Sequence, residues 1–181
     1  MSPLPFFSSP SIKMEKNDVY YFHQTPQALC QELIKHIDLC HGDKVFEPFR
    51  GEGAFYNSFP DFVEKDWTEI TEGRDYKDYM GDIDWVITNP PFKLNDGVKP
   101  ENAFFKLLKY YTAKANKGIA FLGNDRCFAT LTPKRLKEFA NDGWYIHDIV
   151  VCNIKRWRGR YFFIIFKKSP SQFYKHIVGS F

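Results

Sequence analysis

The chain has 181 residues and a mass of 21.3 kDa, a length that predicts one domain and excludes a large multidomain assembly. Hydrophobic residues make up 44% and charged residues 26%, which argues against disorder, and no apolar run is long enough to span a bilayer. The net charge of +3 conceals an asymmetry, because residues 1–100 carry 10 basic and 17 acidic side chains whereas residues 101–181 carry 15 and 5. This polarity favours a polyanion such as a nucleic acid as partner of the second half, unless folding interleaves the charges.

The beginning of the chain divides into a leader and a helix. Residues 1–18 contain three prolines and four serines without periodicity, which predicts a flexible leader. Thr25 is expected to cap a helix that has Pro26 in its first turn. Apolar residues at four-residue spacing from Leu29 give this helix one apolar face, and Gly42 would end it.

Short apolar runs then alternate with helical patterns. Strands are expected at residues 44–46, 66–70, 84–88, 118–122, 145–152 and 161–166, and helices after the first glycine loop, at 101–115 and at 133–140. Because helices separate strands that are apolar throughout, residues 19–181 are predicted to form one α/β domain with a doubly wound, mostly parallel sheet. Ligands of such sheets bind at the carboxyl ends of the strands, and two unusual loops, 47–53 and 89–92, directly follow predicted strands.

The first loop begins with a carboxylate and turns on two glycines. Glu47 precedes Gly51 and Gly53, whose Gly-x-Gly spacing lets a ligand approach the backbone but does not match a phosphate-binding loop. Glu69 ends the next strand, where such folds bind ribose hydroxyls, and Asp75 follows. Singly, each feature could be an ordinary turn or a solvated charge. Together they indicate an adenosine-containing cofactor without a polyphosphate.

The second loop is the sequence Asn89-Pro90-Pro91-Phe92. Its two prolines fix two φ angles and remove two backbone donors, so nearby carbonyls are presented on a stiff turn. An exocyclic amine on a base is a double donor that needs two fixed acceptors and a ring to stack on. The side-chain oxygen of Asn89 and the carbonyl of Pro90 could supply the acceptors, and Phe92 the ring. The structural alternative is a rigid loop that only closes a strand.

These loops resemble those of a known family. The sequence NPPF at 89–92 resembles the catalytic motif of the adenine-N6 methyltransferases, Asp/Asn/Ser-Pro-Pro-aromatic, and EPFRGEG at 47–53 resembles their S-adenosylmethionine loop, Asp/Glu-Pro-Phe-x-Gly-x-Gly. FHQTP at 22–26 resembles the Thr-Pro segment that precedes the cofactor loop in some members. The resemblance covers roughly residues 19–166. It implies a Rossmann-like, seven-stranded methyltransferase sheet, with residues 161–166 in a reversed hairpin at one edge.

The resemblance also implies roles for individual residues. S-adenosyl-L-methionine would be the cofactor, with Glu69 on its ribose and Asp75 at its adenine, and the methyl group would pass directly to the amine without a metal or a covalent intermediate. The catalytic residues would be Asn89, Pro90, Pro91 and Phe92. The cofactor-binding residues would be Phe22, Thr25, Pro26, Glu47, Phe49, Gly51, Gly53, Glu69, Ile70, Asp75, Tyr76 and Asn89.

The implied substrate is adenine in DNA. The catalytic tetrapeptide also occurs in RNA guanine-N2 and protein-glutamine methyltransferases, whose cofactor loops usually read Asp-x-Gly-x-Gly, so Glu-Pro-Phe favours the DNA enzymes. DNA members usually carry a separate target-recognition domain, for which this chain has no room, so recognition would come from loops or from a partner subunit. The same reaction on RNA adenine, and a non-catalytic nucleic-acid-binding subunit, remain as alternatives.

Basic residues of the second half would contact the nucleic acid. Arginines interleaved with a tryptophan suit phosphate contacts and base stacking, although the same run could be a solvated hairpin turn. The expected contacts are Arg126, Lys134, Arg135, Arg156, Trp157, Arg158 and Arg160. Four dispersed cysteines and the absence of metal-ligand spacing favour an intracellular protein, cytoplasmic or nucleoid-associated, without zinc, and the compact chain is compatible with a viral or phage source.

Overall fold

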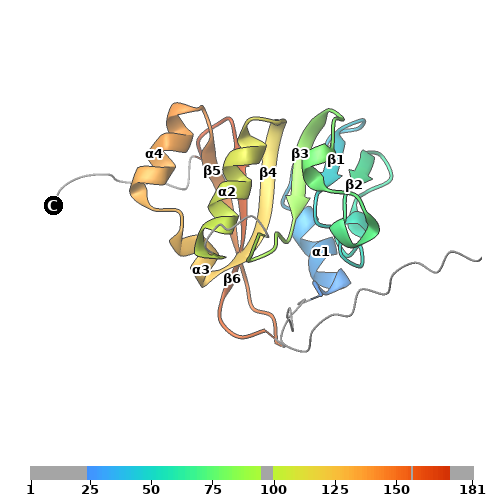
Figure 1. Ribbon diagram of the computed structural model, residues 1–181, viewed down its shortest axis with the longest axis horizontal. Helices are drawn as coiled ribbons and strands as arrows, with labels where there is room; N and C mark the ends of the chain where they lie inside the picture. The colour runs from blue at the N-terminus through green and yellow to red at the C-terminus, as the bar shows by residue number, and fades with distance from the viewer. Residues whose placement is uncertain (1–23, 95–99, 156, 172–181) are drawn as a thin grey trace, which may run out of the picture.

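Six strands form one sheet in the order β2-β1-β3-β4-β6-β5 (Figure 1). This computed structural model describes residues 24–94, 100–155 and 157–171, so the leader expected at 1–18 lies outside the described residues. The strands are β1 (Lys44–Glu47), β2 (Glu64–Trp67), β3 (Ile83–Thr88), β4 (Ala115–Asn124), β5 (Tyr145–Cys152) and β6 (Tyr161–Lys167). The helices are α1 (Gln27–Ile34), α2 (Pro100–Thr112), α3 (Asp125–Ala129) and α4 (Pro133–Asn141), and short 3-10 turns stand at Tyr56–Ser58, Ile70–Glu72 and Tyr76–Asp78.

The sheet is mostly parallel with one reversed strand. β1 pairs in parallel with β2 and β3, and β3 with β4, whereas β6 is antiparallel to both β4 and β5. The α/β class, the doubly wound order and the reversed hairpin at the edge are therefore confirmed. The expected count of seven strands is corrected to six within the described part of the chain.

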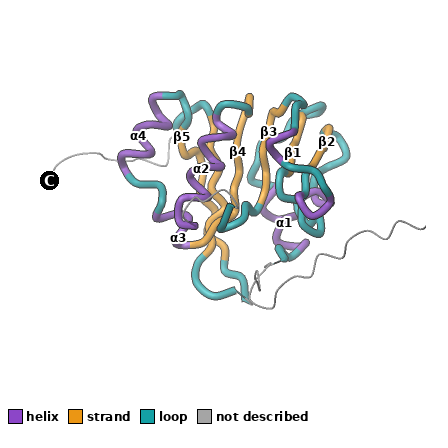
Figure 2. The backbone as a smooth tube through the Cα atoms, viewed as in Figure 1, coloured by secondary structure: helices purple, strands orange, loops and turns teal. Residues whose placement is uncertain are grey.

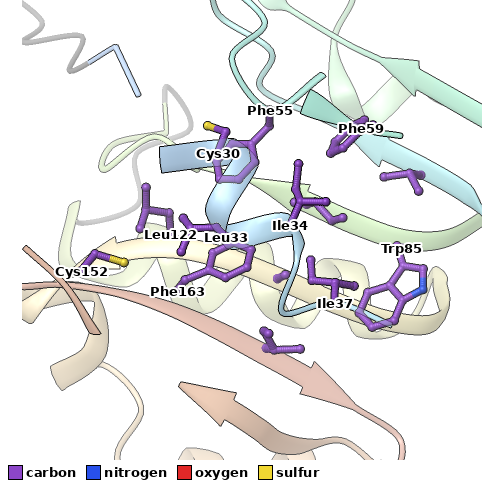
Figure 3. Packing of buried hydrophobic residues seen from close by; sticks show 14 of the residues in the cluster. Cys30, Leu33, Ile34, Ile37, Phe55, Phe59, Trp85, Leu122, Cys152 and Phe163 are labelled. Atoms are coloured by element: carbon purple, nitrogen blue, oxygen red, sulfur yellow. The ribbon is translucent and has the colours of Figure 1, made fainter. Parts of the chain in front are cut away.

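Helices cover both faces of the sheet (Figure 2). On one face α1 buries Cys30, Leu33 and Ile34 against the sheet, and Phe55 and Trp85 join the same core (Figure 3). On the other face a second core holds the apolar sides of α2 and α4. Burying two such faces removes most of the apolar surface of the central strands from water, which explains why β3 is apolar at 85–87 and β4 at 119–122.

Three local predictions were wrong. Thr25 does not cap α1: Pro26 occupies the N-cap position and its carbonyl accepts from the amides of Leu29 and Cys30. The helix ends at Ile34 rather than near Gly42. The glycine loop leads into a 3-10 turn instead of an α-helix. Among the described helices none is long and apolar enough to cross a membrane.

Candidate active site

The carboxyl ends of four parallel strands meet at one edge of the sheet. The loops after β1, β2 and β3 and the helix α3 after β4 therefore lie along this edge. The connection from β5 to β6, residues 153–160, reaches the same edge, because Tyr161 at the start of β6 pairs with both Asn124 and Cys152. In Figure 1 this connection projects from the lower end of the sheet, below α3. The fold thus brings the proposed cofactor, catalytic and basic segments to one edge.

The first glycine loop is bound to the end of β2. The amide of Gly51 donates to Glu69 Oε2 at 2.8 Å, and Glu69 Oε1 accepts from the amide and hydroxyl of Thr71 at 3.2 and 2.9 Å. Gly51 and Gly53 have φ values of +52° and +85°, which residues that carry a side chain rarely adopt. A Cβ on Gly51 would meet no atom within 4 Å, so a ligand can approach the backbone there.

Glu47 is buried at the end of β1. Its Oε2 accepts from the amide of Tyr56 at 2.7 Å. Burial raises the pKa of its carboxyl from 4.5 to about 9, and the neighbouring Glu69 charge adds to this rise, while the Tyr56 hydrogen bond and the Arg50 charge oppose it. Glu47 is therefore a neutral acid at pH 7, which removes the like-charge repulsion that a second carboxylate beside Glu69 would create.

The loop after Glu69 provides apolar surface and a further carboxylate. Ile70 is 65% exposed. The Phe49 and Tyr76 rings lie 5.1 Å apart between centroids, so the first loop also packs on the segment that follows β2. Asp75 caps the turn Tyr76–Asp78 by accepting from the amide of Lys77.

The Asn-Pro-Pro-Phe turn directly follows β3. Asn89 Nδ2 donates to the hydroxyl oxygen of Thr25 at 3.2 Å, which ties the turn to the residues before α1. Asn89 Oδ1 is buried, and no residue of the described chain donates to it. Pro90 is buried, and Phe92 is 36% exposed at the rim. Buried polar atoms normally have partners, so Asn89 Oδ1 stands out as an acceptor whose hydrogen bond is not made within the described residues.

The basic residues expected at the nucleic acid differ in their environments. Arg126 and Arg158 are exposed, on α3 and on the 153–160 connection, and Lys134 is exposed in α4. Arg160 is exposed but pairs with Asp125, whose Oδ2 accepts from the Arg160 amide at 3.3 Å. Arg135 is bound into the fold, because its guanidinium lies on the Phe105 ring and donates to the carbonyl of Thr130.

One expected contact is corrected. Trp157 is only 9% exposed and belongs to the core on the α1 face, with its ring 4.6 Å from that of Tyr161. Burial removes the ring face that base stacking would need. Phe22 and Arg156 lie outside the described residues.

One side-chain group beside the site was not predicted from the sequence, and two hollows lie on the surface away from the site. Arg50 and Arg74 both lie on the Trp67 indole, between the loops after β1 and β2. The hollows, of about 190 and 300 Å³, are lined by residues such as Tyr79 and Asp82 near the amino ends of the strands, opposite Asn89. No group of three His, Cys, Asp or Glu side chains that could hold a metal ion occurs among the residues described.

Solved structures match this fold, whereas no family model and no curated protein matches the sequence. A methyltransferase from Pyrococcus furiosus aligns with a TM-score of 0.56 and 16% identity over 80% of this chain and 83% of that one. The E. cuniculi Mtq2–Trm112 complex, responsible for methylation of the termination factor eRF1, aligns with a TM-score of 0.56 and 13% identity over 78% of this chain and 94% of that one. A protein assigned as the modification subunit of a type I restriction enzyme from Vibrio vulnificus aligns with a TM-score of 0.54 and 14% identity. The alignment covers 82% of this chain and 45% of that one.

At these identities the likeness concerns the fold. The chain has the α/β fold of the S-adenosylmethionine-dependent methyltransferases, with one six-stranded sheet.

Proposed function

We propose that the protein transfers a methyl group from S-adenosyl-L-methionine to the exocyclic N6 amine of adenine in DNA. The observation that carries this proposal is the buried Oδ1 of Asn89 at the carboxyl end of β3, to which no described residue donates a hydrogen bond. The Thr25 hydroxyl accepts from the other end of the same amide, so the oxygen is the end left for a donor. A purine amine is such a donor, and the two prolines hold the acceptor on a stiff turn.

Residues at the neighbouring strand ends would bind the cofactor. Glu69 is held by the Gly51 amide, and its carboxylate can accept further hydrogen bonds from ribose hydroxyls. Ile70, exposed beside it, offers an apolar surface to an adenine ring. The open side of Gly51 lets a ligand approach the backbone. When bound there, S-adenosylmethionine would supply an electrophilic methyl group.

The protein's own residues would then orient the amine. Asn89 Oδ1 and the Pro90 carbonyl would accept its two hydrogens, and Phe92, at the exposed rim, would stack on the base. Neutral acceptors favour the positive charge that develops on the nitrogen during transfer. Holding the amine in one orientation also supplies rate through proximity and alignment.

DNA is proposed as substrate because of the Glu-Pro-Phe cofactor loop and the basic surface on the catalytic edge. Arg126, Arg158 and Arg160 are exposed there and could contact a phosphate backbone. The same charges suit RNA equally well, so adenine in RNA is the second candidate. Recognition of either would rely on loops or on a partner subunit.

The proposal is tested by incubating the protein with S-adenosylmethionine and unmethylated duplex DNA, single-stranded DNA or RNA, and quantifying methylated nucleosides by mass spectrometry. N6-methyldeoxyadenosine is the expected product. It should form faster on the single strand, because extruding a base from a duplex costs a few kcal/mol. Product in RNA alone would overturn the DNA assignment, and no product with cofactor bound would favour a binding subunit.

A further inference from the structure

Two arginines lie on one indole between the loops that follow β1 and β2. Cζ of Arg50 lies 3.8 Å and Cζ of Arg74 lies 4.1 Å from the ring centroid of Trp67, the last residue of β2. Arg50 also pairs with Glu72, and Arg74 pairs with Asp66 at 3.0 Å. We call Arg50, Trp67 and Arg74 the arginine–tryptophan stack.

The backbone beside each arginine holds Glu69. The amide of Gly51, next to Arg50, donates to the Glu69 carboxylate at 2.8 Å. The amide of Arg74 donates to the Glu69 carbonyl at 3.1 Å, and the two residues form an antiparallel bridge. The Arg50 amide itself donates to the carbonyl of Thr68 at 3.1 Å. Glu69 is therefore held from both loops that the stack joins.

The contact with the indole is the part of the stack that fixes these loops. Both ion pairs have carboxylates that are nearly half exposed, and exposed pairs contribute little. A planar guanidinium on an indole combines packing with cation–π attraction, and the Arg50 side chain is only 23% exposed. A lysine at the same place would lack the planar group and could not stack in this way.

We infer that the stack positions the Gly51 amide and the Glu69 carboxylate so that Glu69 can bind the ribose hydroxyls of the cofactor. The inference rests on the proposed function. Arg50 and Trp67 are then positioning residues, which act on the cofactor through Glu69 and the first glycine loop.

The first test measures binding of S-adenosylmethionine and of its 2′,3′-dideoxy analogue by calorimetry. Arg50→Gln should weaken binding of S-adenosylmethionine about tenfold, the equivalent of one hydrogen bond to a charged group. It should leave the weaker binding of the analogue unchanged, because the analogue has no ribose hydroxyls for Glu69. The matched control is Lys65→Gln, which removes the same charge from β2, where Lys65 lies on the Tyr56 ring.

Equal losses for both ligands would overturn the positioning role. They would indicate that Arg50 contacts the cofactor directly. Its buried Nε–H could make this contact, because it has no acceptor within the described residues. A normal affinity of Arg50→Gln for both ligands would overturn the inference as well. Trp67→Phe, which keeps a ring, should retain more affinity than Trp67→Leu.

The second test needs no cofactor. Hydrogen exchange of the Gly51 amide, followed by NMR, should accelerate in Arg50→Gln and in Arg50→Lys but not in Lys65→Gln. Unchanged protection of Gly51 in Arg50→Gln would refute the role of the stack even if the protein binds S-adenosylmethionine. Failure of the wild-type chain to bind S-adenosylmethionine would instead refute the proposed function, while the exchange rates would still decide whether the stack holds the loop.

Discussion

The loops after β1 and β3 lie at the same edge of the sheet but are held very differently. The first is bound to the end of β2 by the Gly51–Glu69 contact, by the amide of Thr68 on the Glu47 carbonyl, and by the Thr68 hydroxyl on the Pro48 carbonyl. The second has the link from Asn89 to Thr25 and keeps a buried acceptor without a donor in the described chain. The loop after β1 is therefore already fixed by the fold, whereas the turn after β3 would gain a further hydrogen bond from a ligand.

Removing the Asn89 side-chain acceptor should have the largest effect. Asn89→Ala is expected to lower kcat by at least about 100-fold, as loss of one preorganised transition-state contact does, while the Kd for S-adenosylmethionine stays nearly unchanged. Single-turnover rates and calorimetry check the two parts. Asn141→Ala, at the exposed end of α4, is the control. Loss of cofactor binding in Asn89→Ala would contradict the division between the loops.

Disrupting the contact between Glu69 and the loop after β1 should affect cofactor binding before it affects catalysis. Glu69→Ala is expected to weaken S-adenosylmethionine binding by about 10- to 100-fold, because hydrogen bonds to a charged group contribute about 1.5–3 kcal/mol. Glu64→Ala, at the exposed amino end of β2, should bind normally. A normal cofactor affinity of Glu69→Ala, measured by calorimetry, would remove the ribose role.

Glu47, at the start of the first glycine loop, should give the stability of the protein an unusual dependence on pH. The pKa of Glu47 rises from 4.5 to about 9, so the folded protein keeps a proton that the unfolded chain releases between these values. Its contribution to the free energy of unfolding is thus complete below pH 4.5 and is lost as the pH rises toward 9, with a slope of at most about 1.4 kcal/mol per unit.

Glu47→Gln, which keeps the shape without the titration, should therefore gain in melting temperature relative to the wild type between pH 5 and pH 8.5. Thermal unfolding across this range measures the difference. Parallel curves for the two proteins would mean that Glu47 is ionised in the folded state.

The smallest effect is expected on the basic side of the edge. Arg158→Gln should reduce the slope of log K against log salt for DNA binding by about 1, because one phosphate contact is lost. Lys35→Gln, an exposed residue of the α1 end paired with Glu32, should leave the slope unchanged. Fluorescence anisotropy over a salt series distinguishes these outcomes, and an unchanged slope in Arg158→Gln would exclude its phosphate contact.

The sequence predicts the elements better than it predicts their partners. The apolar strands and the order of the loops follow from local patterns, and they were enough to predict a doubly wound sheet. Thr25 was misjudged because N-cap preference is local, whereas its partner Asn89 lies 64 positions away. A tryptophan among arginines has the same pattern whether it stacks on a base or, like Trp157, belongs to the hydrophobic core.

Two parts of the site had no sequence signal. Nothing in the spacing of Arg50, Trp67 and Arg74 indicates that the three side chains meet, because their contact depends on the parallel pairing of β1 with β2. Ionisation of Glu47 likewise depends on burial, which tertiary packing decides.

The central claim is that the Asn-Pro-Pro-Phe turn receives the N6 amine of adenine. It is tested most directly with a single-stranded DNA oligonucleotide containing one adenine, and with a second in which purine, lacking the amine, replaces that base. Transfer of labelled methyl from S-adenosylmethionine is predicted for the first oligonucleotide and not for the second. Equal labelling of both would contradict the claim.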